Sequence, residues 1–190
     1  MDAHSLKVLQ FHKALEYLAN FASTNVGREM ALSLEPSNHI EVVNRRHQET
    51  RESRSLISVG QGMPFGGIRD IREIVERARM GGVLIPRDLL EVSSTCQSGR
   101  RLKQFLQKRH AETPLLAEIA SNIPQFPLLE QRIGESIADN AEVRDSASPE
   151  LARIRNQHKI VHTRLMERLN SLLASDKYKS FIQEPIITLR

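Results

Sequence analysis

Two clusters of basic side chains are the residues of this sequence whose type and spacing best suit them to bind a ligand. The first comprises Arg100, Arg101, Lys103, Lys108 and Arg109. The second comprises Arg153, Arg155, Lys159, Arg164 and Arg168, opposed within residues 151–168 only by Glu167. Lys and Arg contacts to phosphates give binding that weakens with salt and ignores base sequence. The second cluster contains no aromatic residue, so base stacking is not expected there.

The second cluster therefore supplies the candidate nucleic-acid contacts, and the alternative for both clusters is an ordinary solvated helix face. Other reactive residues do not assemble into a site. His158 and His162 stand four residues apart on one helical face, but no third metal ligand accompanies them. Cys96 has no neighbouring base to activate its thiol. We therefore predict no catalytic residue, no metal site and no cofactor site in this chain.

A glycine-rich segment at residues 60–69 is the remaining candidate for a phosphate contact. Its sequence, GQGMPFGGIR, lacks the Lys-Ser/Thr pair of a nucleotide-binding P-loop. Asp70 follows directly, and an acid at the start of a helix disfavours an anion there. The preferred interpretation is a connector between two helices, the usual role of glycine-rich turns.

The composition places these residues in a helical protein. The chain has 190 residues, six Phe, two Tyr and no Trp, and it is rich in Leu, Ala, Glu and Arg. Those residues favour helices, whereas sheets use more aromatic and β-branched residues. The formal net charge is +4, and the excess lies in residues 148–190, which hold 8 basic and 4 acidic residues. A single cysteine and the lack of a long apolar run predict a cytoplasmic protein without a disulfide or a membrane span.

The elements that must position the candidate contacts follow from apolar spacing and from helix-start signals. Capping boxes are expected at Asn38/Glu41 and Asp70/Glu73, and Ser148-Pro149-Glu150 is typical of a helix start. An extended segment is expected at 137–143, and Glu184 to Arg190 reads as the beginning of a strand. We predict helices at 5–22, 26–34, 38–57, 70–80, 86–109, 113–122, 128–137 and 149–174.

The fold class expected is mostly α, a multi-helical core with one long protruding helix and a truncated C-terminal β-strand. The long helix has a narrow apolar seam, typical of a helix that pairs with another helix. A strand needs a neighbour to be stable. We therefore interpret the sequence as a fragment of a longer protein. The seam residues are Leu151, Ile154, His158, Val161, Leu165 and Leu172.

Several of these segments together resemble the N-terminal region of the second MutS subfamily, bacterial relatives of the mismatch-repair ATPase. The match extends over essentially the full chain. The segments that carry it are Leu9 to Lys13 with Leu15 and Leu18, PFGGIRDIR at 64–72, GGVLIP at 81–86, DSASPELARIR at 145–155 and QEPIITLR at 183–190.

The resemblance implies a domain plan. Proteins of this subfamily lack a mismatch-reading domain and begin with a helical core and lever, followed by a clamp, a dimerising ATPase and a small nuclease domain. By this resemblance, residues 1–147 form the core, 148–183 the lever helix and 184–190 the start of a clamp strand. ATP and Mg²⁺ serve the full-length protein, whose ATPase and nuclease motifs this chain does not contain. No catalytic residue can be transferred to it, so its own status as an enzyme stays open.

The resemblance also implies partners. The subfamily is described as suppressing homologous recombination on branched DNA and as binding collided ribosomes. The expected partners are therefore branched DNA or ribosomal RNA, the rest of the same chain and, at full length, a second copy in a homodimer. Our interpretation is a core and lever segment with a structural role that contacts nucleic acid without catalysis. The alternative is a helical protein–protein interaction module whose seam pairs with another protein.

Overall fold

The computed structural model describes residues 3–58, 60 and 62–175, and these residues form helices and short connections. Nine α-helices and one 3-10 helix lie in this described part. The β-pairing found there is a single antiparallel bridge between Ile137 and Val143, as expected for an extended segment at 137–143. The predicted strand at 184–190 lies outside the described residues. The elements are α1 (Ala3–Val8), α2 (Phe11–Ala19), α3 (Asn25–Leu32), α4 (Ile40–Ser58), α5 (Arg72–Arg79), α6 (Pro86–Gln107), α7 (Pro114–Ser121), α8 (Pro127–Ser136), η1 (Asp145–Ala147) and α9 (Pro149–Leu173).

The single helix predicted over residues 5–22 is wrong, because the chain breaks at Gln10. Gln10 takes the left-handed conformation with a φ of 50° and separates α1 from α2. In one straight helix, Leu6 and Phe11 would point about 140° apart. The break instead lets both side chains line one cleft with Leu34, which follows α3. The break therefore brings apolar side chains of α1, α2 and the end of α3 together around one cleft.

Helix starts follow the sequence signals only in part. The Ser148 hydroxyl accepts a hydrogen bond from the Leu151 N–H at 3.2 Å, which confirms the predicted cap of α9. The predictions of capping boxes at Asn38/Glu41 and Asp70/Glu73 are wrong. The Ser37 hydroxyl accepts from the His39 N–H before α4. At α5 the Asp70 carboxylate accepts from Arg72 instead of closing a box with Glu73.

The core lies where α4, α6 and α7 meet. Leu56, Leu106 and Ala120 are its buried residues. Partly buried apolar residues surround them, including Met63 from the glycine-rich segment. Glu52 is 7% exposed, and its carboxylate accepts hydrogen bonds from two backbone N–H groups in the first turn of α7. The core therefore includes a buried acidic side chain that joins α7 to α4.

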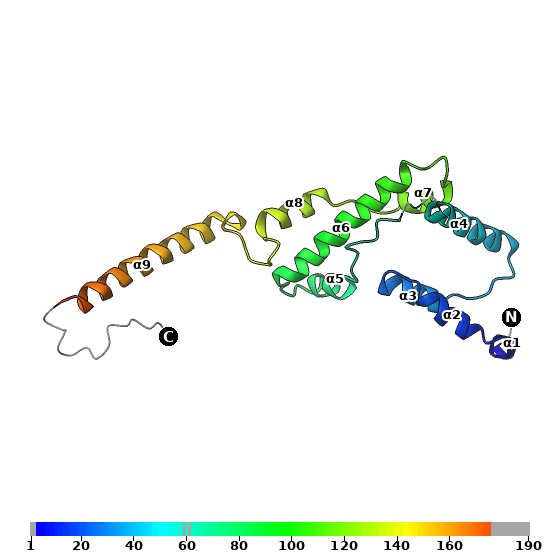
Figure 1. Ribbon diagram of the computed structural model, residues 1–190, viewed down its shortest axis with the longest axis horizontal. Helices are drawn as coiled ribbons and strands as arrows, with labels where there is room; N and C mark the ends of the chain where they lie inside the picture. Colours follow the sequence, from blue (N-terminus) through cyan, green and yellow to red (C-terminus); the bar gives the residue numbers. More distant parts are fainter. Residues whose placement is uncertain (1–2, 59, 61, 176–190) are drawn as a thin grey trace.

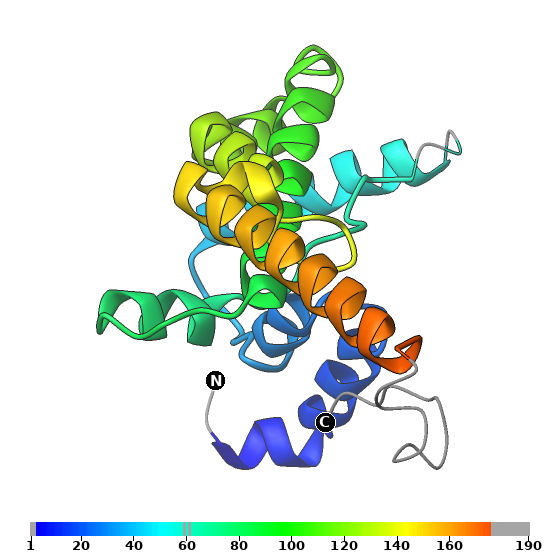
Figure 2. The same ribbon diagram turned by 90° about the vertical axis from the view of Figure 1, so that its left-hand side faces the viewer.

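The described molecule is elongated, with α1–α3 toward one end and α9 projecting from the other (Figure 1). Viewed along the long axis, α9 crosses in front of the other helices (Figure 2). None of the residues of α9 is buried, and its main contact with another described element is with η1. No helix in the described part is long and apolar enough to cross a membrane.

Candidate nucleic-acid interface

All five predicted contact residues lie on α9, but they do not form one row. With 3.6 residues per turn, Arg153, Arg164 and Arg168 fall within roughly 60° of one another around the helix axis. Arg155 and Lys159 lie roughly 120° or more away from all three. All five side chains are exposed. The positive charge is therefore divided between two sides of the helix.

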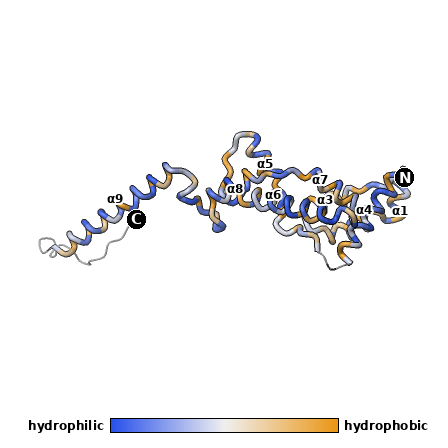
Figure 3. Tube along the Cα trace, turned by 90° about the horizontal axis from the view of Figure 1, so that it is seen from above, coloured by the Kyte–Doolittle hydropathy of each residue, from blue (hydrophilic) through white to orange (hydrophobic). Residues whose placement is uncertain are grey.

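The seam of apolar side chains runs between these two basic groups. Ile154 is 50% exposed, Val161 63% and Leu165 46%, so the seam faces solvent among the described residues. Polar and apolar positions accordingly alternate along α9 in Figure 3. Long cationic side chains at such flanks can cover an apolar seam with their methylenes while their charges stay in water. The arrangement suits contact with an acidic surface, either a phosphate backbone or a protein helix.

Arg155 has a structural partner that the sequence analysis did not anticipate. Its guanidinium donates to the Val143 carbonyl at 2.7 Å and to the Asp145 carboxylate at 2.6 Å. Val143 belongs to the bridged segment, and Asp145 begins η1. The segment is joined to α8 because the Ser146 hydroxyl donates to the Glu135 carbonyl at 2.6 Å. Arg155 therefore holds the root of α9 and is less available for phosphate than its neighbours.

The other four cations are less constrained. Arg153 forms an ion pair with Glu150 at 2.9 Å within α9 itself. Lys159, Arg164 and Arg168 form no ion pair with the residues that the structure describes. These three side chains are the best candidates for an external anion.

The first basic cluster, on α6, contributes to packing between helices. Arg100 forms an ion pair with Glu130 at 2.7 Å, and that carboxylate is 7% exposed. The Lys103 ammonium donates to the carbonyls of Ser121 and Ile123, both at 2.9 Å. These bonds join α6 to α8 and to the end of α7. Arg100 and Lys103 therefore have a structural role, whereas Arg101 and Lys108 are exposed, as the solvated-face interpretation expects.

The histidine pair lies on α9, and the cysteine lies on α6 near Glu130. The rings of His158 and His162 stack with centroids 6.3 Å apart, and the described residues contain no group of three potential metal ligands. Partial burial and the nearby Glu130 carboxylate raise the pKa of the Cys96 thiol. A raised pKa keeps the thiol protonated and weakly nucleophilic.

The glycine-rich segment is clamped against α6, and this contact was missed in the sequence. The Ser98 hydroxyl donates to the Gly66 carbonyl at 2.7 Å, and the Ser94 hydroxyl donates to the Gly67 carbonyl at 3.0 Å. The Arg69 N–H donates to the Thr95 hydroxyl at 3.0 Å. Ser94, Thr95 and Ser98 lie within about one helical turn, so their hydroxyl spacing was the available signal. The segment connects α4 to α5, as expected, and residues 66–69 of it are held on α6.

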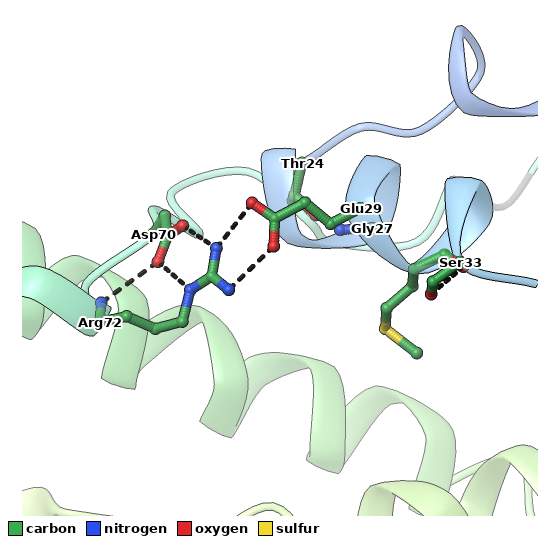
Figure 4. A network of polar contacts seen from close by, with 7 residues as sticks. Thr24, Gly27, Glu29, Ser33, Asp70 and Arg72 are labelled. Atoms are coloured by element: carbon green, nitrogen blue, oxygen red, sulfur yellow. Dashed lines mark hydrogen bonds and ion pairs between the residues drawn. The ribbon is translucent and has the colours of Figure 1, made fainter. Parts of the chain in front are cut away.

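The same segment is also joined to α3. The Arg72 guanidinium forms ion pairs with Asp70 and, at 2.8 Å, with Glu29 (Figure 4). The hydrogen bonds from Arg72 lower the pKa of Asp70 to about 2, and Arg72 also lowers the pKa of Glu29. Asp70 therefore stays ionised above about pH 2, and it shares the single positive charge of Arg72 with Glu29.

Comparisons with known proteins place the chain beside one group of relatives. No family model matches it. It is 37% identical over 190 residues to an endonuclease MutS2 from Pelotomaculum thermopropionicum and covers 24% of that protein. It is 40% identical over 190 residues to the endonuclease MutS2 of Symbiobacterium thermophilum, again covering 24%. The match to the protein of the same name from Geobacillus sp. strain WCH70 is 36% over 193 residues and covers 25%. The chain thus spans about a quarter of the length of the curated relatives it matches.

Proposed function

Since the whole chain is homologous to an N-terminal segment of the MutS2 endonucleases, we propose that it forms the core and lever of such a protein. Residues 1–147 make up the core in this proposal, and residues 148–183 form the lever that reaches nucleic acid. The observation that carries the proposal is the projection of α9 from the body with exposed, unpaired cations. A rigid projecting helix suits the transmission of motion between parts of a larger protein.

The chain's own role in this proposal is contact and positioning. Lys159, Arg164 and Arg168 bind backbone phosphates, whereas Arg155 keeps α9 oriented on η1. Branched DNA and ribosomal RNA share the phosphate chemistry that these cations recognise. ATP with Mg²⁺, strand cleavage, homodimer formation and a cytoplasmic location are proposed only for the longer protein, by its likeness to proteins named endonuclease MutS2.

The test is a salt titration of binding to four-way-junction DNA and to duplex DNA. We expect an affinity that falls as salt rises, because cation release from the phosphates drives binding. A Lys159→Ala/Arg164→Ala/Arg168→Ala variant should weaken binding and reduce the magnitude of the slope of log K against log salt by up to about 3.

The matched control is Arg45→Ala/Arg51→Ala/Arg79→Ala, which removes the same charge from other exposed helix faces. It should leave the salt slope close to that of the unmodified chain. Equal losses in both triple variants would mean that net charge, and not α9, attracts the DNA. No binding at low salt would refute a nucleic-acid contact by this segment.

A protein–protein module is the second candidate, favoured by the exposed apolar seam. Under this proposal the apolar seam itself pairs with another helix, and the flanking cations contribute little to the pairing. Leu165→Asp should then abolish a concentration-dependent association seen by analytical ultracentrifugation, while the Lys159/Arg164/Arg168 variant changes it little. The reverse pattern would favour nucleic acid.

A further inference from the structure

A cleft between the start of α3 and the end of the glycine-rich segment contains two arginines that the lever proposal does not use. Arg28 comes from the first turn of α3, and Arg69 comes from the segment clamped on α6. The polar residues Ser23 and Asn25 also line it. Two arginines from elements about forty positions apart in the sequence thus line one cleft.

The charges in this cleft do not cancel. Asp70 is the acidic residue in its lining, and its two carboxylate oxygens accept hydrogen bonds from Arg72 (Figure 4). The nearby Glu29 carboxylate is held by the same guanidinium. Neither Arg28 nor Arg69 forms an ion pair with any residue that the structure describes. Together with Arg72, three guanidinium groups therefore stand against two carboxylates, so this region keeps a net charge of +1.

The backbone that carries Arg69 is held on both sides. Thr95 accepts a hydrogen bond from its N–H, and the adjoining Gly67 carbonyl is fixed by Ser94. On the other side, the Asp70–Arg72–Glu29 ion pairs join the segment to α3. A fixed backbone reduces the conformational entropy that a ligand must remove when it binds.

We propose that Arg28 and Arg69 form a binding site for a phosphate group in this cleft. Guanidinium groups donate parallel hydrogen bonds to phosphate oxygens, and two of them can share one dianion. The side chains of Ser23 and Asn25 supply further donors to the same oxygens. The group is either a backbone phosphate of a nucleic acid or a free phosphate compound, and both present the same chemistry to the arginines.

A second cleft on the other side of Arg69 is a poorer site for an anion. It includes Arg87, but Glu91 and Asp139 also line it. Neither carboxylate is in an ion pair with a described residue, so both would repel a phosphate. We therefore place the phosphate on the α3 side, and Arg87 provides a matched control.

The test is a titration of the full chain with inorganic phosphate, and NMR monitors the binding. Chloride keeps the ionic strength constant. We expect saturable shifts in the N–H resonances of Ser23 to Arg28 and of Arg69. Arg28→Gln or Arg69→Gln should abolish saturation, while Arg87→Gln should preserve it. Thermal unfolding of each variant checks that it remains folded. Absence of saturable shifts, or shifts that survive both Arg28→Gln and Arg69→Gln, would overturn the proposal.

A second arm separates the two sources of phosphate and keeps this inference distinct from the lever proposal. Duplex DNA is added to the phosphate-saturated chain and to the Lys159/Arg164/Arg168 variant. If the site binds a nucleic-acid backbone, DNA displaces the phosphate. In that case, adding Arg69→Gln to the Lys159/Arg164/Arg168 variant weakens its DNA binding further. Phosphate binding without any DNA binding would support a free phosphate compound here while refuting nucleic-acid contact by α9.

Discussion

Gly67 shows at the scale of one residue why the glycine-rich segment has its sequence. Its φ is +92°, and a β-carbon there would lie 2.7 Å from the Ser98 Oγ and 2.8 Å from the Ser94 Oγ. Both the backbone conformation and the close approach to α6 therefore require glycine. The same two hydroxyls hold the segment in place, because they donate hydrogen bonds to the Gly66 and Gly67 carbonyls.

Gly67→Ala should destabilise the chain by about 2–4 kcal/mol, through positive-φ strain together with overpacking against α6. Gly81→Ala is the matched control, because Gly81 has a φ of +77° with nothing within 4 Å of the added carbon. The free energy of unfolding of the control should fall by only about 1 kcal/mol, because only the backbone conformation is strained. Urea unfolding of both variants measures the difference, and equal losses would show that packing on α6 does not constrain this position.

Asp70 leads to a prediction about pH at the same scale. Hydrogen bonds from Arg72 lower its pKa to about 2 in the folded chain, from an ordinary value of 3.8. A lowered folded-state pKa stabilises the fold above the unfolded value, and this stabilisation is lost as pH falls toward the folded value. The ion pair should therefore persist at pH 4 and weaken between about pH 4 and pH 2.

A carboxyl-detected NMR titration of Asp70 checks this prediction directly. Its midpoint should rise toward the ordinary range in an Arg72→Gln variant, because the hydrogen bonds and the positive charge are both removed. A midpoint near 3.8 in the unmodified chain would contradict the ion pair. Added salt should also raise the midpoint, since the groups are exposed and screened.

Glu52 acts at the scale of elements by joining two helices that are distant in sequence. Its oxygens accept hydrogen bonds from the Leu115 N–H at 3.3 Å and the Leu116 N–H at 3.0 Å. Thr113, at the N-cap position of α7, makes no side-chain cap bond. A carboxylate on α4 therefore replaces the local capping residue that most helices use.

Glu52→Gln should destabilise the fold by about 1–2 kcal/mol, because it weakens two charge-assisted bonds at a buried helix start. Glu49→Gln on the same helix is the control, since Glu49 pairs with Arg45, whose side chain is 51% exposed. Exposed pairs of this kind contribute less than about 0.5 kcal/mol. Equal midpoints of thermal unfolding in the two variants would refute the proposed cap.

The direction of α9 relative to the body is a property of the whole molecule. The helix has 25 residues and is about 37 Å long, so a small rotation at its root moves its far end considerably. Arg155 bonds the root to Val143 and Asp145, whereas Arg153 bonds only within the helix. Arg155 is therefore expected to set the direction, although the sequence presents the two arginines as equivalent.

Spin labels at Gln104 and Asn170, in a chain with Cys96→Ser, measure that direction as a distance distribution. Arg155→Met should broaden the distribution, because the two hydrogen bonds that restrain the helix root are lost. Arg153→Met removes the same charge and should leave the width unchanged. Identical distributions in the two variants would mean that apolar packing on η1 alone orients α9.

The sequence by itself determined most of the helical segments, the Ser148 cap before α9, and which group of proteins the chain resembles. These features depend on local propensity, on apolar spacing and on short motifs, all of which act over a few residues. The domain boundaries and the nucleic-acid contacts remain predictions. Where local signals competed with packing they failed, as at Gln10, where two apolar side chains reach one cleft only if the helix breaks.

Only the tertiary structure decided which basic side chains are available to bind an external ligand. Arg155 and Arg100 resemble their basic neighbours in the sequence, yet each is held by a carboxylate distant along the chain. Arg28 and Arg69 gave no sequence signal, because their nearness depends on the glycine-rich segment docking on α6 and on α3. Long-range ion pairs and shared clefts arise from the path of the whole chain, whereas sequence spacing predicts contacts only within one helix or turn.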